Sequence, residues 1–181
     1  MRRTGISAVL AMIAVASCST PGRENPAPPL PDSEAVAQAD LRDSSGRTAA
    51  RASLSQVGDA VRVRIEAAGL PTGIYGAHVH AVGRCDAPAF ESAGPHWNPS
   101  NRQHGRDNPN GQHLGDLPNL MVGTDRRGSL EFTIPGAELS GGARPLLDAD
   151  GAALVLHARP DDYRTDPSGN SGARIACGLV G

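Results

Sequence analysis

Residues 61–67 read VRVRIEA, and apolar and polar side chains alternate along the whole stretch. Side chains two apart on a strand point to the same face, so this alternation predicts a strand with one buried and one solvated face. Residues 47–55 show a weaker alternation of the same kind, and Gly58-Asp59 lies between the two segments. A short turn of this composition is typical of a hairpin, so we expect two antiparallel strands here.

Two further strands are expected at residues 129–134 (SLEFTI) and 152–157 (AALVLH). The second is almost entirely apolar, which indicates a strand near the centre of a sheet. Residues 33–41 are open to two interpretations, because their composition allows a short helix as well as an opening strand.

Two long segments, residues 84–116 and 158–176, lie between these strands and show no periodicity. Loops longer than about 12–15 residues are uncommon unless they have a function. The sequence therefore predicts an all-β fold, an antiparallel barrel or sandwich whose two long loops carry the functional site.

The composition allows a core but gives no indication of a nucleic-acid partner. Of the 181 residues, 39% are hydrophobic and only 3% aromatic, so the core must consist mainly of Val, Leu, Ile and Ala. The net charge is −2, and the sequence has no basic run or basic–aromatic patch.

The first 18 residues are expected to be a lipoprotein signal peptide. Arg2 and Arg3 precede an apolar run at 6–16, which is too short to span a bilayer. The run leads into VASC at 15–18, which resembles a bacterial lipobox with Cys18 as the lipidated residue. An ordinary signal peptide with an incidental cysteine is the alternative.

The domain boundaries follow from this interpretation. Residues 19–33 hold five prolines and are expected to form a tether, and residues 34–181 are expected to form one domain. The protein would be exported to the periplasm or cell envelope and would contact the membrane only through its lipid anchor. If Cys18 carries lipid, Cys85 and Cys177 remain as a pair in an oxidising compartment.

Histidines mark a candidate metal site. His78 and His80 are two apart on an expected strand, so both imidazoles would point to one face. A pair of surface histidines is the commoner explanation of such a motif. His157, at the end of the apolar strand, argues against it, because a buried histidine requires a partner.

The loop at 94–116 supplies a second group: His96, His104, His113 and Asp116. Imidazole and carboxylate suit tetrahedral Zn²⁺, and a metal can fold a loop that has no core of its own. A solvated histidine-rich loop is the alternative.

The order and spacing of these residues resemble those of the exported bacterial copper/zinc superoxide dismutases over residues 36–181. The segments that carry the resemblance are GAHVHAVGRC, SAGPHWNP, QHLGDLPNL, LVLHARPDD and GARIACGLVG. The resemblance implies a Greek-key β-barrel or sandwich and two metal ions, copper and zinc. It assigns copper to His78, His80, His96 and His157, and zinc to His96, His104, His113 and Asp116.

The resemblance also implies the roles of other residues. His96 would bridge both metals and move a proton, and Arg174 would guide the substrate, superoxide. Asp161 would join His78 to His104, and Cys85 and Cys177 would form the family disulfide. The implied reaction is the dismutation of superoxide by copper cycling between Cu(II) and Cu(I), beside a structural zinc.

The sequence departs from the family in two places: extra length around LLDADGA at 146–152, and Trp97 after His96. Contacts of a homodimer are not identifiable, so the sequence leaves open whether the protein is a monomer or a homodimer. Two non-enzymatic alternatives remain, a periplasmic metal-binding protein on the same scaffold and a structural cell-surface sandwich.

Overall fold

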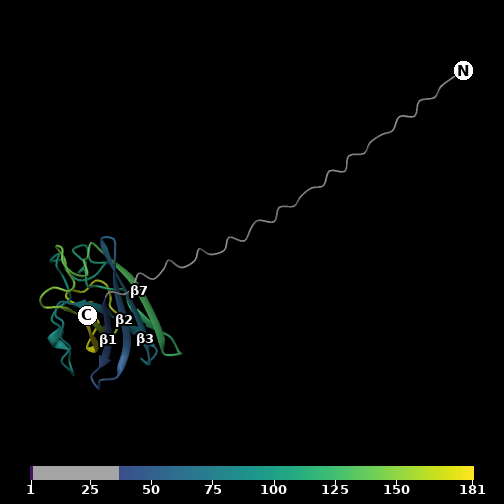
Figure 1. The fold of residues 1–181 in the computed structure, drawn as a ribbon. Coiled ribbons are helices and arrows are strands. Elements are labelled where there is room, and N and C mark those ends of the chain that lie inside the picture. Colours follow the sequence, from purple (N-terminus) through teal and green to yellow (C-terminus); the bar gives the residue numbers. More distant parts are fainter. Residues whose placement is uncertain (2–36) are drawn as a thin grey trace. The chain divides into compact units, whose positions relative to one another are not determined.

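The computed structural model describes Met1 and residues 37–181, and this part of the chain is built from β-strands and one short 3-10 helix (Figure 1). The predicted signal peptide, Cys18 and the tether lie outside the described residues. The strands are β1 (Ala37–Asp43), β2 (Thr48–Val57), β3 (Ala60–Ala68), β4 (Gly73–Tyr75), β5 (Ala77–His80), β6 (Leu120–Val122), β7 (Arg127–Pro135), β8 (Ala152–His157) and β9 (Arg174–Val180), and the helix is η1 (Glu91–Ala93).

Seven strands form one curled antiparallel sheet in the order β5-β8-β9-β1-β2-β3-β7, and β4 and β6 form a second, two-stranded sheet. β1, β2, β3 and β7 lie side by side in Figure 1. β3 pairs with β7 and β1 with β9, although each pair is far apart in sequence. These crossover connections agree with the predicted all-β Greek-key class.

The predicted hairpin is present and has the predicted turn. β2 pairs with β3 from Val57↔Ala60 onward, so Gly58 and Asp59 form the connection. Val61, Val63 and Ile65 of β3 are fully buried, and their polar neighbours point away from the core. The period-two alternation therefore identified both the strand and its buried face.

β8 is an interior strand, as its apolar sequence predicts. It pairs with β5 on one side and β9 on the other, and all six of its residues are buried. The described part of the opening segment, residues 37–41, belongs to the strand β1 and not to the alternative helix, since Ala37, Ala39 and Leu41 alternate into the core.

The loop boundaries differ from those expected. The second long loop ends at residue 173, because residues 174–176 already belong to β9. Residues 136–151 form a third long connection, between β7 and β8, that includes the extra length around LLDADGA. The strands β4 and β6 were not predicted, since three residues are too few to show a period.

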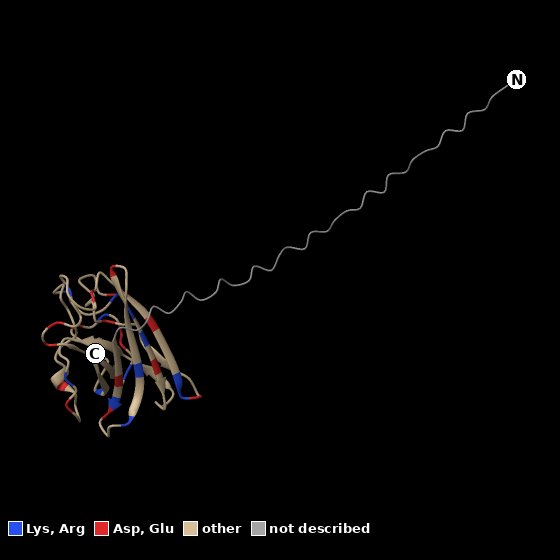
Figure 2. Ribbon diagram, viewed as in Figure 1, with Lys and Arg blue, Asp and Glu red and all other residues tan. Residues whose placement is uncertain are grey.

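Charged residues of both signs are interspersed over the face of the sheet seen in Figure 2. Within the described part of the chain, no helix is long and apolar enough to cross a membrane.

Candidate metal centre

Two neighbouring strands position three of the histidines. β5 carries His78 and His80, β8 ends at His157, and all three side chains are buried. The ring centroid of His157 lies 4.7 Å from that of His78 and 5.7 Å from that of His80. Backbone pairing of β5 with β8 therefore brings the three imidazoles together.

The first long loop runs along β5 and adds His96. Hydrogen bonds from Trp97 N to Val79 O (2.8 Å) and from Val79 N to Gly115 O (2.9 Å) attach the loop to the strand. The ring of His96 consequently lies 4.0 Å from that of His78, centroid to centroid.

Four histidines form the first group of candidate ligands, which we call the four-histidine group. One ring nitrogen of each lies within 4.8 Å of the others, and every member is buried. One nitrogen of each ring is buried without a hydrogen-bond partner: His78 Nδ1, His80 Nε2, His96 Nε2 and His157 Nε2. Buried polar atoms normally have partners, so unpaired nitrogens that converge in this way fit a bound cation such as copper.

The other ring nitrogens are held by hydrogen bonds, which fix the orientation of each ring. His80 Nδ1 lies 2.8 Å from Gly94 O, and His157 Nδ1 lies 3.2 Å from Gly172 O. His78 Nε2 lies 2.7 Å from Asp161 Oδ2. With a proton on each of these nitrogens, the lone pair of the opposite nitrogen faces the group.

Asp116 is the centre of a second group, the Asp116 group. Its Oδ1 lies 2.9 Å from His96 Nδ1, 3.0 Å from His104 Nδ1 and 3.1 Å from His113 Nδ1. Ligands bound tetrahedrally at 2.0–2.1 Å from Zn²⁺ are separated by about 3.3 Å. The distance from the carboxylate oxygen to each of the three nitrogens is thus close to the spacing between ligands in a zinc site.

Either His113 or His78 can be counted as the fourth candidate ligand of this second group. The donor atoms within 4.8 Å of one another there are those of His78, His96, His104 and Asp116, with His78 in place of the predicted His113. His113 Nδ1 nevertheless lies 3.1 Å from Asp116 Oδ1, whereas His78 directs Nε2 at Asp161 and has Nδ1 in the four-histidine group.

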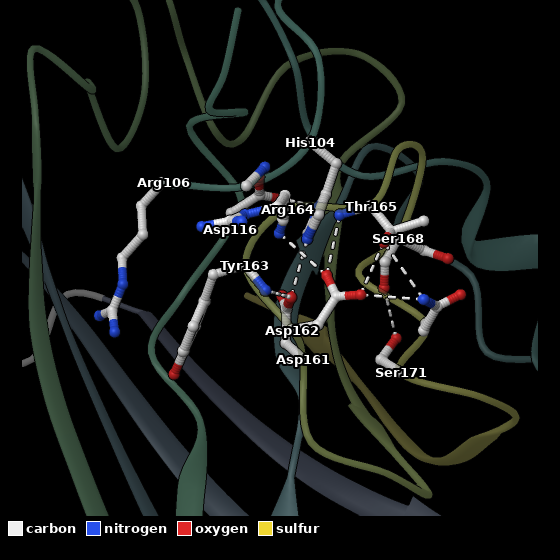
Figure 3. Close-up of polar contacts among 12 residues, drawn as sticks. His104, Arg106, Asp116, Asp161, Asp162, Tyr163, Arg164, Thr165, Ser168 and Ser171 are labelled. Atoms are coloured by element: carbon white, nitrogen blue, oxygen red, sulfur yellow. Dashed lines mark hydrogen bonds and ion pairs between the residues drawn. The ribbon is translucent and has the colours of Figure 1, made fainter. Parts of the chain in front are cut away.

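Asp161 joins the two groups. Its Oδ2 contacts His78 Nε2 at 2.7 Å, and its Oδ1 contacts His104 Nε2 at 2.9 Å and the backbone N–H of Tyr163 at 2.6 Å. Figure 3 shows His104 directed at this carboxylate. Asn119 fixes the backbone of Asp161, accepting from its N–H (2.8 Å) and donating to its carbonyl (3.0 Å).

Burial keeps the four-histidine group neutral. It lowers the pKa of His78 to about 3, of His80 to about 2 and of His157 to about 4. Neutral imidazole is the form that binds a metal, so these rings need to lose no proton at neutral pH.

The pKa of His104 moves in the opposite direction. Burial alone would lower it, but hydrogen bonds to Asp116 and Asp161 outweigh burial and raise it to about 9. The Asp116 carboxyl shows the complementary effect: burial would raise its pKa, but hydrogen bonds from His104, His113 and His96 hold it well below its usual range. The carboxylates of Asp116 and Asp161 therefore favour the protonated form of His104, and a bound cation would compete with that proton.

Arg174 lies at the entrance to the four-histidine group. It shares a surface pocket of about 680 Å³ with His80, His96 and His157. Its guanidinium donates to Phe90 O at 2.7 Å and to Gly94 O at 2.8 Å. The residue predicted to guide the substrate is thus fixed at the opening onto three members of the four-histidine group.

Cys85 and Cys177 form the predicted disulfide, with a Cα–Cα distance of 5.6 Å. It joins the first long loop to β9, the strand that begins with Arg174. The bond therefore ties the loop of His96 to the strand that carries the guanidinium.

All the predicted site residues within the described part of the chain lie in this region or border it. The sequence did not reveal the roles of Gly94 and Asn119. The carbonyl of Gly94 is the hydrogen-bond partner of both His80 and Arg174, and Asn119 hydrogen-bonds to the backbone of Asp161. Backbone acceptors leave no pattern in a sequence, although Asn119 lies within the segment QHLGDLPNL that carries the family resemblance.

Comparison with known proteins identifies relatives along most of the chain. The family model described as copper/zinc superoxide dismutase (SODC) matches residues 48–180. Superoxide dismutase (Cu-Zn) 1 of Aquifex aeolicus is 41% identical over 151 residues, or 81% of this chain and 88% of that protein. Superoxide dismutase (Cu-Zn) of Caulobacter vibrioides is 40% identical over 147 residues, or 80% of this chain and 84% of that protein.

A solved structure shares the fold. The crystal structure of a SOD-like protein from Bacillus subtilis has a TM-score of 0.74 at 40% identity and covers 78% of this chain and 96% of that chain. The matched family model, the relatives and the shared fold agree, and the chain belongs to the copper/zinc superoxide dismutase family.

Proposed function

We propose that the chain catalyses the dismutation of superoxide, 2 O₂•⁻ + 2 H⁺ → O₂ + H₂O₂. The four-histidine group would hold copper, and His96, His104, His113 and Asp116 would hold zinc. The observation that carries the proposal is the position of His96 between the groups. Its Nε2 is an unpaired atom of the first group, and its Nδ1 lies 2.9 Å from Asp116 Oδ1 in the second.

A bound copper ion would supply the one-electron chemistry, accepting an electron from one superoxide and returning it to another while cycling between Cu(II) and Cu(I). The residues of the chain would position the metal ions and transfer protons. His96 lines the pocket, and its Nε2, buried in the four-histidine group, can hold a proton and pass it to the reduced oxygen species. Asp116 Oδ1 lies 2.9 Å from the other ring nitrogen, Nδ1, and holds the ring in place, so the proton is delivered from a fixed position.

Arg174 would attract the substrate. Superoxide is an anion and the chain has a net charge of −2, so the overall field of the protein repels it. A fixed guanidinium at the pocket reverses the field locally, an effect for which superoxide dismutase is the standard example. Phe90 O and Gly94 O hold the guanidinium in place.

We also propose export and lipid anchoring through Cys18. The support lies in the sequence: two N-terminal arginines, the apolar run at 6–16 and the lipobox-like VASC. Mass spectrometry of the mature protein would test this, since the proposal requires a diacylated N-terminal Cys18.

The activity is tested by loading the purified chain with copper and zinc and following the decay of superoxide by pulse radiolysis. We expect rapid decay in wild type and none above background in His157→Ala. Co²⁺ bound in the Asp116 group provides the control, because its absorption spectrum should be retained in His157→Ala. Metal binding without catalysis in wild type would instead favour the metal-binding protein considered above.

A further inference from the structure

Asp162, the residue after Asp161, organises the second long loop. Its Oδ1 accepts hydrogen bonds from the N–H groups of Arg164 (2.9 Å) and Thr165 (2.8 Å). Its Oδ2 accepts from Thr165 Oγ1 (2.6 Å) and Asn170 Nδ2 (2.9 Å), so one carboxylate joins both ends of residues 162–170 (Figure 3). Asp162 itself contacts no candidate ligand in these hydrogen bonds.

The backbone closes the same turn. Asp162 N donates to Gly169 O at 2.9 Å, and Gly169 N donates to Thr165 O at 2.6 Å. The turn therefore fixes Gly169 relative to Asp162, and so relative to Asp161.

Gly169 lies directly against the contact between Asp161 and His104. A Cβ at this position would lie 2.5 Å from Asp161 Cγ and 2.7 Å from His104 Nε2, closer than real Cβ contacts allow. Gly169 also has φ +63°, which disfavours other residues. The backbone of Gly169 thus lies so close to the carboxylate that no side chain fits between them.

We propose that Asp162 and Gly169 are positioning residues of the metal centre, because the turn that Asp162 closes presses Gly169 against Asp161. Asp161 then has one orientation, in which it joins His78 to His104. The inference rests on the proposed function, since it concerns how tightly the Asp116 group holds zinc.

The expected effect is a loss of zinc affinity. If the Asp161 carboxylate is displaced, His104 Nε2 loses its acceptor, and the ring is no longer oriented toward Asp116. Removal of such a partner typically weakens metal binding by about 10- to 100-fold.

The first test compares Gly169→Ala with Gly58→Ala in the metal-free full chain. Gly58 has φ +60°, and a Cβ there would meet nothing within 4 Å, so the control has the same backbone strain without the clash. Zinc affinity is measured by competition with a chromophoric chelator, and site geometry by the absorption of bound Co²⁺. We expect weaker zinc binding and an altered Co²⁺ spectrum for Gly169→Ala only.

The second test keeps the proposal falsifiable if Gly169→Ala does not fold. Asp162→Asn removes the Oδ2 acceptor and is compared with Asp43→Asn. Asp43 organises another turn in the same way, accepting from Ser45 N (2.9 Å), Ser45 Oγ (2.6 Å) and Arg47 Nε (3.0 Å). A structural role alone predicts a similar loss of thermal stability in both variants and no difference in zinc affinity.

The outcomes separate the two proposals. Zinc affinity reduced in Asp162→Asn but not in Asp43→Asn would support the positioning role. Equal zinc affinity in both, with wild type binding zinc normally, would overturn this inference alone. Wild-type protein that binds no zinc would contradict the proposed function and this inference with it.

Discussion

His80 and Arg174 hydrogen-bond to the same carbonyl oxygen, that of Gly94, each at 2.8 Å. One is a candidate copper ligand and the other is the cation that faces the pocket. Because a backbone atom connects them, the guanidinium has a fixed position relative to the four-histidine group.

Arg174→Glu is expected to lower the rate of superoxide decay by about tenfold or more, in the range of steering effects for which superoxide dismutase is the standard example. The reversed charge would repel the substrate, so added salt should raise the rate of the variant and lower that of wild type. Stopped-flow or pulse-radiolysis rates at several ionic strengths provide the measurement. Arg127→Glu, at the start of β7, changes the net charge equally and should have a much smaller effect. Unchanged kinetics in Arg174→Glu would remove it from this role.

Glu91→Gln is expected to raise the same rate by a few-fold. Glu91 lines the pocket together with Arg174, and its negative charge opposes the attraction of an anion. The affinity of Cu(II) for azide, followed by absorption, should rise as well. A rate and an azide affinity equal to those of wild type would show that this carboxylate does not influence entry.

Removal of the disulfide, as Cys85→Ser with Cys177→Ser, should lower both stability and zinc affinity. The cross-link spans a sequence separation of 92 residues. Chain entropy alone gives a loss of roughly 4–5 kcal/mol in the free energy of unfolding. Denaturant unfolding measures the first effect and chelator competition the second. Equal zinc affinity in the reduced and oxidised proteins would show that the disulfide does not help the first long loop to bind zinc.

The metal-free protein should be most stable near the ordinary histidine pKa of 6.5. Burial lowers the pKa of His78, His80 and His157 to about 3, 2 and 4, so the unfolded chain binds more protons, and stability falls as the pH drops below 6.5. His104, raised to about 9, acts in the other direction, and its contribution is lost as the pH rises from 6.5 through 9. Thermal unfolding of chelator-treated protein across this pH range tests for the stability maximum. A melting temperature that does not change with pH would contradict it.

The strands β2, β3, β7 and β8 could be predicted from the sequence, because each leaves a local pattern, and the convergence of the histidines could be predicted from their order and spacing. VRVRIEA shows its buried face in its alternation, and AALVLH shows two buried faces in its apolar run. The order of the histidines resembles that of a known family, and the structure brings them together with Asp116. Their metal-binding roles stay a prediction.

The remaining features depend on contacts between distant segments. Nothing in the sequence around Gly169 shows that its backbone lies against His104, 65 residues earlier. The strands β4 and β6, three residues each, pair with each other although they are more than 40 residues apart in sequence. Whether His78 or His113 is the fourth candidate ligand in the Asp116 group likewise depends on which ring nitrogen of His78 contacts Asp161.

The candidate ligands divide between two kinds of backbone. His78, His80 and His157 lie on β5 and β8, which pair with each other, whereas the loop of His104, His113 and Asp116 is attached to β5 by hydrogen bonds such as Val79 N to Gly115 O. The three strand histidines would consequently keep their relative positions through sheet pairing, while the zinc cage would depend on how the loop is attached to β5. A bound zinc ion would cross-link this loop and, through the shared ring of His96, also brace the fourth corner of the copper cage.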